Sequence, residues 1–376
     1  MTSMLFVFRV DASLQMGSGH VMRCLTLADA LTAQGAQCHF VCREFVGNLL
    51  ALIRQRGYTA DAVPAPIEPT QVAAPEGDKN DSAQRNLYEG WLGISWQKDA
   101  AQTRVIVEKL KPDWLVVDHY GLDRRWEAAL RPRCKKLMVI DDLADRVHQC
   151  DWLLDQNLGR IPQDYVSLVP AQCKVLAGPQ YALLRPEFAA LRAYSLQRRQ
   201  QPVLKQLLVT MGGVDLPNAT GKVLQALKDC ALPQDCRISV VMGPQAPWLA
   251  HIRVQAQDMP WPTEVLVNIS DMAQHMADSD FAIGAAGSTS WERCSLGLPT
   301  LMVVLADNQR RAAQALQVAQ AAHLIDDLSN IAMQLPIVIN APALRHRLQQ
   351  MSTAAAAVTD GRGADEVLQA LRVLND

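Results

Sequence analysis

The sequence predicts an α/β protein built from two domains of similar size, each with a parallel sheet covered by helices. The chain has 376 residues, which exceeds the size at which a single hydrophobic core keeps growing. Short apolar runs alternate with stretches of helical pattern, as in parallel β-α-β folds. The alternation restarts near the middle of the chain, again as a strand, a glycine turn and a helix, which favours two doubly wound domains.

The expected strands fall into two sets. In the first half they lie at residues 4–10, 37–43, 114–118, 136–141 and 152–155. In the second half they lie at residues 206–211, 238–242, 264–267, 281–283 and 300–304. The polar run at 191–201 and the proline that follows predict a linker, and hence domains at residues 1–190 and 203–376. Segment 67–90 lacks periodicity, which is typical of a surface insertion or a mobile lid.

The composition is that of an ordinary globular protein. Hydrophobic residues make up 49% and charged residues 20%, and the net charge is −2 with no basic block, which argues against nucleic acid as a partner. No run is long enough to cross a membrane and the N-terminus shows no secretion signal, so we expect a cytoplasmic protein. Nine cysteines without a CxxC pair and eight histidines without HExxH spacing predict reduced thiols and no bound metal.

A strand-to-helix turn near the N-terminus carries a candidate base. The first strand is followed by Asp11, Gly17, Gly19 and His20, and a helix is expected at about residues 21–33. The glycines let a ligand approach backbone N–H groups, and a helix N-terminus favours an anion and a neutral imidazole that can accept a proton. The alternative is a purely structural tight turn, because the motif is not a complete GxGxxG.

Polar residues also follow two later strands of the first half. The strand at 114–118 ends in Asp118 and runs into His119, Tyr120 and Gly121, and the strand at 136–141 ends in Asp141, followed by Asp142. The carboxyl ends of parallel strands share one edge of the sheet, where such folds bind ligands. Each residue alone could cap a helix or form a turn, but three strand ends that meet at one edge favour a site.

Two loops of small residues in the second half suit a diphosphate. One follows the strand at 206–211 and contains Gly212 and Gly213. The other follows the strand at 281–283 and contains Gly287, Ser288 and Thr289. Such loops expose N–H groups and hydroxyls to phosphate oxygens. They could equally be structural glycine turns.

Polar side chains beyond these loops could contact the rest of a nucleotide-sugar. Glu292, in the helix after the second loop, could hold ribose hydroxyls. Asn308 and Gln309 follow the strand at 300–304, and their amides could bind sugar hydroxyls or acetamido groups. Residues of this kind also simply begin helices, so the sequence alone leaves both interpretations open.

Taken in order, these segments resemble the UDP-sugar hydrolases of pseudaminic acid biosynthesis, which release UDP from UDP-2,4-diacetamido-2,4,6-trideoxy-β-L-altropyranose. The resemblance covers roughly residues 4 to 310. No single piece is diagnostic, but the ordered set is specific. It is carried by residues 9–11, 17–24, 117–120, 140–142, 150–151, 181–188, 211–215 and 287–292, with Asn308 and Gln309.

The resemblance implies a GT-B-like fold of two Rossmann-like domains facing a cleft, a small-molecule UDP-sugar as substrate, and no cofactor. His20 would be the catalytic base and Tyr120 its partner in the site. Substrate and UDP would be held by Asp11, Gly17, Gly19, Gly212, Gly213, Gly287, Ser288, Thr289, Glu292 and Asn308. Segment 67–90 and the tail after residue 330 depart from the family pattern, and neither the exact sugar nor the oligomeric state follows from the resemblance.

The reaction expected from these residues is an inverting hydrolysis that needs no metal. A neutral His20 would deprotonate water for attack on the anomeric carbon, and the glycine-loop amides would stabilise the departing UDP. Two alternatives remain. In a GT-B glycosyltransferase with a UDP-amino-sugar donor, His20 would activate an acceptor hydroxyl instead of water, and a non-catalytic binding module would hold the nucleotide-sugar without turnover.

Overall fold

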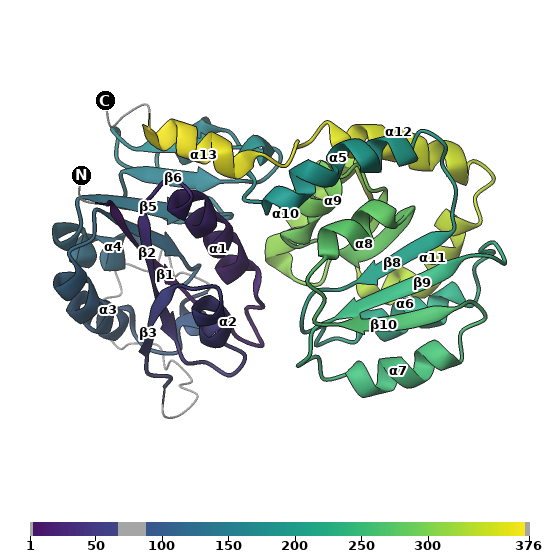
Figure 1. Ribbon diagram of the computed structural model, residues 1–376, viewed down its shortest axis with the longest axis horizontal. Coiled ribbons are helices and arrows are strands. Elements are labelled where there is room, and N and C mark those ends of the chain that lie inside the picture. The colour runs from purple at the N-terminus through teal and green to yellow at the C-terminus, as the bar shows by residue number, and fades with distance from the viewer. Residues whose placement is uncertain (1–2, 67–87, 373–376) are drawn as a thin grey trace, which may run out of the picture. The chain divides into compact units, whose positions relative to one another are not determined.

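The computed structural model describes residues 3–66 and 88–372, which form two compact units (Figure 1). Unit 1 contains residues 1–183 together with 364–376, and unit 2 contains residues 184–363. Each unit has its own parallel sheet and its own hydrophobic core. The predicted α/β fold of two parallel-sheet domains is confirmed.

Unit 1 is a three-layer domain around a sheet with strand order β3-β2-β1-β4-β5-β6-β7 among the described residues. Both faces of β1 are buried: Phe6 and Phe8 pack in the core that includes α1 and α13, and Val7 packs in the core that includes α3 and α4. This two-sided burial explains why the central strands are continuous apolar runs. The elements are β1 (Leu5–Val10), α1 (Gly19–Thr32), β2 (Gln37–Arg43), α2 (Leu50–Gln55), β3 (Thr59–Val63), η1 (Glu89–Leu92), α3 (Trp96–Leu110), β4 (Trp114–Asp118), α4 (Arg124–Leu130), η2 (Arg131–Arg133), β5 (Lys136–Ile140), β6 (Trp152–Asp155), η3 (Pro162–Tyr165), β7 (Lys174–Ala177), η4 (Pro179–Tyr181) and α13 (Gly363–Arg372).

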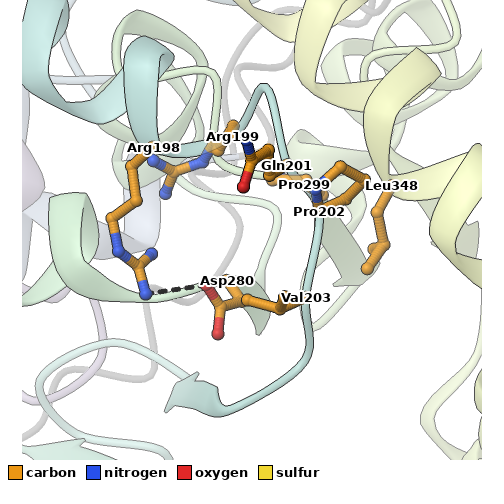
Figure 2. A pocket seen from close by; sticks show the side chains of 8 residues that line it. All are labelled: Arg198, Arg199, Gln201, Pro202, Val203, Asp280, Pro299 and Leu348. Carbon is orange, nitrogen blue, oxygen red and sulfur yellow. Dashed lines mark ion pairs between the residues drawn. The ribbon is translucent and has the colours of Figure 1, made fainter.

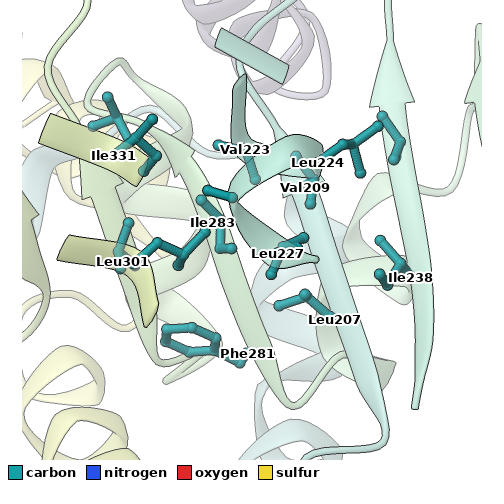
Figure 3. Packing of buried hydrophobic residues seen from close by; sticks show 14 of the residues in the cluster. Leu207, Val209, Val223, Leu224, Leu227, Ile238, Phe281, Ile283, Leu301 and Ile331 are labelled. Carbon is teal, nitrogen blue, oxygen red and sulfur yellow. The ribbon is translucent and has the colours of Figure 1, made fainter. Parts of the chain in front are cut away.

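Unit 2 repeats this plan with strand order β10-β9-β8-β11-β12-β13 among the described residues. Figure 3 shows its core, in which Val209 and Ile283 of neighbouring strands pack against Leu227 of α6 and Ile331 of α11. The elements are α5 (Pro186–Arg198), β8 (Gln206–Thr210), α6 (Ala219–Leu227), β9 (Arg237–Met242), α7 (Leu249–Gln257), β10 (Thr263–Val267), α8 (Met272–Asp278), β11 (Phe281–Ala285), α9 (Thr289–Ser295), β12 (Thr300–Val303), α10 (Asp307–Val318), β13 (His323–Ile325), η5 (Leu328–Asn330), α11 (Ile331–Ile339) and α12 (Leu344–Ala356).

The domain boundaries differ from the predicted ranges 1–190 and 203–376. Most of the expected linker is helix α5, whose Ser195 hydroxyl donates to the carbonyl of Leu296, at 2.7 Å, inside unit 2. The last helix, α13, belongs to unit 1, where Val367 is buried in the same core as Phe6 and Trp114. Helix α5 has a polar composition, so its sequence looked like a linker. Nothing in the local sequence indicates that α13 packs back into the core of unit 1.

The remaining expectations concern cysteines, metals and membranes. All nine cysteines are free thiols. Within residues 3–66 and 88–372 no helix has the length and apolarity to cross a membrane, and no three Cys, His, Asp or Glu residues gather as metal ligands would. Most of the segment expected as an insertion or lid, residues 67–87, lies outside the described residues.

Candidate functional site

Each sheet has one place where the strand order reverses, and open α/β sheets bind ligands at such places. In unit 1 this place lies between β1 and β4, and in unit 2 it lies between β8 and β11. The register pairs Val10 with Asp118 in the first sheet and Gly284 with Thr210 in the second. The loops singled out in the sequence follow these four strands, so each sheet has one candidate edge.

The turn after β1 places His20 at the carboxyl edge of the sheet of unit 1. Gly17 has φ of 75°, a left-handed conformation that favours glycine, and its N–H donates to the carbonyl of Ser13 at 2.8 Å. Helix α1 begins at Gly19, which places His20 in the first turn. The His20 side chain is 11% exposed, so it is held in place yet accessible to a small molecule.

His20 is oriented by a buried carboxylate. Its Nδ1 lies 2.7 Å from Oδ1 of Asp118, the last residue of β4. Arg23, one turn along α1, donates to both oxygens of the same carboxylate, from Nε at 2.6 Å and from Nη2 at 2.7 Å. Burial alone would raise the pKa of Asp118, but the charges of Arg23 and His20 outweigh burial and hold that pKa well below its usual range.

Nδ1 of His20 lies 2.7 Å from the Asp118 carboxylate and 3.3 Å from Nη2 of Arg23, so the shorter contact, to the carboxylate, favours one form of the ring. Because the Asp118 carboxyl is ionised, the proton shared between the two groups sits on Nδ1 of the imidazole. In the neutral ring, Nε2 then carries the lone pair and can accept a proton. The same arrangement of carboxylate and imidazole stabilises the imidazolium that forms when Nε2 is protonated.

Tyr120 forms one wall beside His20. Its ring meets the His20 ring edge-on, with centroids 4.6 Å apart and an interplanar angle of 86°. The Tyr120 hydroxyl donates to Oδ2 of Asp142 at 2.6 Å, and Nη1 of Arg23 donates to the same oxygen at 2.7 Å. Burial, followed by the charge of Asp142, raises the pKa of Tyr120 well above its ordinary value, so the hydroxyl stays protonated.

Asp11 does not face the edge as the sequence suggested. Its side chain is fully buried, and Oδ1 accepts from Nη1 of Arg9 and from the backbone N–H of Arg43, each at 2.6 Å. Its Oδ2 lies 3.5 Å from Nε2 of His119, whose Nδ1 accepts from the N–H of Gly121 at 2.9 Å. Burial lowers the pKa of His119 to about 4. Asp11 therefore supports the loop from behind and has no exposed side-chain atom in this structure.

A buried ion network anchors this support. Nη2 of Arg9 and Nη2 of Arg43 donate to Oδ2 of Asp99 at 2.6 Å and 2.5 Å, and the Trp126 indole N–H donates to Oδ1 at 2.8 Å. These side chains come from β1, β2, α3 and α4. Removing one member of such a network leaves an uncompensated buried charge, so the network fixes these elements relative to one another.

A second acidic cluster lies beside Asp142. The Tyr165 hydroxyl is 2.7 Å from Oδ2 of Asp155 and 2.9 Å from Oδ2 of Asp141. One hydroxyl proton satisfies only one carboxylate, so the second contact requires a proton on an acid. Burial, followed by the charge of Asp142, raises the pKa of Asp155 to about 7, whereas Asp141 has a lowered pKa, so Asp155 is the more readily protonated of the two acids.

In unit 2 the loop after β8 is open and glycine-rich. Gly212 has φ of 88°, and both Gly212 and Gly213 are exposed. Asp215 accepts the backbone N–H groups of Ala219 and Thr220, at 2.8 Å and 2.9 Å. The start of α6 is therefore capped by the chain's own carboxylate, and an anion at this edge would meet the glycine loop instead.

The loop after β11 lies next to the loop after β12. The N–H of Ala286 donates to the carbonyl of Val303 at 3.0 Å. The amide of Gln309 lies beside Gly287, where an added Cβ would sit 3.9 Å from Nε2. Oε1 of Gln309 accepts from the N–H of Leu305 at 3.1 Å, which closes the second loop.

The other expected residues of unit 2 lie on the same side of the sheet. Ser288 is exposed, and Thr289 and Asn308 are half-buried. Glu292 is 17% exposed, lies 3.9 Å from Nη2 of Arg185, and has its pKa raised by burial. The structure brings the loops that carry Gly212, Gly287 and Asn308 to the carboxyl ends of neighbouring strands β8, β11 and β12.

A separate small pocket opens at the opposite edge of the same sheet (Figure 2). It is lined by Arg198, Arg199, Gln201, Pro202, Val203, Asp280, Pro299 and Leu348. Asp280 and Pro299 precede β11 and β12, whereas the glycine loops follow their strands. Asp280 is ion-paired with Arg198 at 2.8 Å and accepts the N–H groups of Lys205 and Gln206. This pocket is not part of the candidate site.

Several residues that complete the site of unit 1 were not assigned a role from the sequence. They are Arg23, Asp118 and Asp142, with Asn157, whose Nδ2 donates to Oδ1 of Asp142 at 3.0 Å. Asp118 and Asp142 had a local signal as polar residues at strand ends, and Arg23 had one because residues i and i+3 share a face of a helix with His20. Asp118 lies 98 positions from His20 in the sequence, and Asn157 lies 15 positions from Asp142. Only the fold shows that these residues are in contact.

Comparisons with known proteins agree with this architecture. Residues 207–367 match the family described as Glycosyltransferase family 28 C-terminal domain. The fold is similar to that of MurG of Acinetobacter baumannii, with a TM-score of 0.67 and 17% identity, covering 99% of this chain and 100% of that one.

Two curated relatives extend over both units. The chain is 25% identical over 308 residues to the UDP-2,4-diacetamido-2,4,6-trideoxy-beta-L-altropyranose hydrolase of Campylobacter jejuni, covering 82% of this chain and 94% of that protein. It is also 25% identical over 305 residues to an uncharacterised protein of Methanocaldococcus jannaschii, covering 80% of this chain but 55% of that longer protein. The chain therefore has the GT-B fold, its residues 207–367 match a glycosyltransferase family domain, and it resembles the Campylobacter hydrolase over most of its length.

Proposed function

We propose that the protein hydrolyses UDP-2,4-diacetamido-2,4,6-trideoxy-β-L-altropyranose to UDP and the free diacetamido sugar, as a cytoplasmic step of pseudaminic acid biosynthesis. The observation that carries the proposal is the 2.7 Å contact between Nδ1 of His20 and Asp118, which leaves Nε2 as a proton acceptor on an accessible side chain. The likeness to the Campylobacter hydrolase supports the choice of substrate.

In the proposed reaction, His20 Nε2 takes a proton from water as the water oxygen attacks the anomeric carbon. The bond from that carbon to the diphosphate oxygen breaks, and UDP leaves with the bonding electrons, so the anomeric configuration inverts. Asp118 stabilises the imidazolium, and Tyr120 holds the ring plane. In unit 2 the loops with Gly212, Gly213, Gly287, Ser288 and Thr289 would bind the UDP moiety, with Glu292 on the ribose and Asn308 near the sugar.

The test is hydrolysis of this UDP-sugar by the purified full chain in ¹⁸O-labelled water with EDTA present. We expect UDP and free sugar, with the label in the sugar, because water attacks carbon. Label in UDP would show attack on phosphorus and contradict the mechanism. Substrate that binds but stays intact would favour a glycosyltransferase awaiting its acceptor, which the family match of residues 207–367 makes the second candidate.

Replacing the base gives the second part of this test. His20→Asn should lower turnover by about 10²- to 10⁴-fold, the usual contribution of a general base, and leave UDP affinity unchanged. His346→Asn is the matched control, because His346 is an exposed histidine on α12. A His20→Asn variant with normal turnover would overturn the assignment.

A further inference from the structure

Arg293 of α9 is a buried cation directly beneath the loop after β11. The residue is 1% exposed, and Nη2 donates to the carbonyl of Ala285 at 2.7 Å and to the Ser290 hydroxyl at 3.2 Å. Nη1 donates to the Thr289 hydroxyl at 3.3 Å. An added Cβ on Gly284 would come within 2.5 Å of Nη1, so β11 carries a glycine where the guanidinium lies against the strand.

The charge of Arg293 has no carboxylate in contact among the described residues. Its acceptors are one carbonyl and two neutral hydroxyls, and its Nε has no partner there. Burial lowers the pKa of Arg293 to about 10, so the guanidinium is still charged at neutral pH. A buried and unbalanced cation is costly, so a feature of this kind suggests that an anion completes it.

Arg199, a second buried arginine in unit 2, also has an Nε without a partner among the described residues and a pKa lowered to about 10 by burial, but it has more carbonyl acceptors. Arg199 donates to the carbonyls of Ser195, Met276, Ala277 and Ser279. Three of these carbonyls lie at the C-terminal end of α8, where the free carbonyls of a helix carry partial negative charge. Arg293 lacks such a set of carbonyls, although both arginines are buried to a similar degree.

We infer that Arg293 is the positioning residue for the diphosphate of the nucleotide: it ties the loop of residues 285–290 together from behind, and its positive charge is balanced by the bound diphosphate. This inference rests on the proposed function, because it assumes that the loop binds UDP. It adds a specific source of phosphate affinity that is separate from the chemistry at His20.

The test compares UDP with uridine, which lacks the diphosphate, as ligands of the full chain. Arg293→Met should weaken UDP binding on the order of ten- to a hundredfold, as expected for losing one charge several ångströms away at an effective dielectric near 20, and leave uridine binding unchanged. Arg293→Lys keeps the charge and should recover part of the UDP affinity. Arg199→Met is the matched control, which should change neither ligand's affinity.

Calorimetry gives the UDP affinity, ligand-observed NMR gives the uridine affinity, and circular dichroism verifies folding. Equal weakening of UDP and uridine in both Arg293 variants would show a purely structural role and overturn the inference, as would unchanged UDP affinity. In either case normal hydrolysis would leave the proposed function standing. Failure of the unaltered protein to bind UDP would instead overturn the nucleotide site as well.

Discussion

The two sheets have the same topology, yet their candidate edges are built from opposite chemistry. At the edge of unit 1, His20, Asp118, Arg23 and Asp142 form a connected and largely buried set of charges. At the edge of unit 2, the loops are made of glycines and hydroxyl residues, and the nearby cation Arg293 has no carboxylate in contact among the described residues. One edge suits a group that moves a proton, and the other suits an anion that arrives from solution.

The difference extends behind the edges. In unit 1, four buried carboxylates have pKa values below their usual range, because neighbouring arginines and histidines outweigh the burial that would raise them: Asp11, Asp99, Asp118 and Asp141. In the described part of unit 2, the carboxyl groups with a lowered pKa are the exposed Asp235 and Asp327. We therefore expect the stability of unit 1 to be the more sensitive to protonation of its buried carboxylates.

The largest expected effect is that of low pH on the relative stability of the two units. A carboxylate with a folded pKa below its unfolded value stabilises the fold above the unfolded pKa, near 3.8, and that stability is lost as pH falls towards the folded pKa. Four such groups act in the same direction, so their protonation together destabilises unit 1 as the pH falls. Below about pH 4 we expect unit 1 to open before unit 2. Hydrogen exchange corrected for intrinsic rates should show residues 3–66, 88–183 and 364–372 losing protection first.

Between pH 7 and 4 the hydrogen-exchange protection of unit 1 should change little. His119 has a folded pKa of about 4, so the unfolded chain takes up its proton first and stability falls as pH drops below 6.5. Asp155 has a folded pKa of about 7, so the folded chain takes up its proton first and stability rises over the same range. Opening of residues 184–363 before unit 1 at any pH would contradict the contrast.

The next largest effect is expected at Asp118. Asparagine cannot hold the Nδ1–H form of His20 as a carboxylate does, so Asp118→Asn should lower turnover by about 10²- to 10⁴-fold with UDP affinity retained. Asp29→Asn is the control, because Asp29 accepts hydrogen bonds from Tyr58 and Arg56, away from His20. A drop of less than about fivefold would mean that the 2.7 Å contact does not orient the base.

The fold was largely predictable from the sequence, and the strands that were missed share one physical reason. The strands at 37–43, 114–118 and 152–155 match β2, β4 and β6, whose apolar runs are buried in the sheet. The missed strands are β3, β7 and β13, each at an edge of its sheet. An edge strand is short and partly polar, so it lacks the continuous apolar run of a central strand.

The site was predictable only where its residues are adjacent in the chain. The motifs singled out His20, Tyr120 and the glycine loops as candidates, because turn residues and strand ends leave local signals. Asp11 looked equally suitable, but Arg43 and His119 enclose it from 32 and 108 positions away. Whether a polar residue faces a ligand or supports a loop depends on such distant partners, which no local pattern encodes.

The smallest expected effect distinguishes two roles for Tyr120. Because its hydroxyl donates to Asp142 and its pKa is raised by burial, Tyr120→Phe should cost about one hydrogen bond, on the order of 1 kcal/mol, and lower turnover by less than about tenfold. Tyr58→Phe, which removes the hydrogen bond to Asp29, is the matched control. A loss of about 10²-fold or more in steady-state turnover would show instead that the Tyr120 hydroxyl takes part in proton transfer, and would make the edge of unit 1 a two-residue acid–base site.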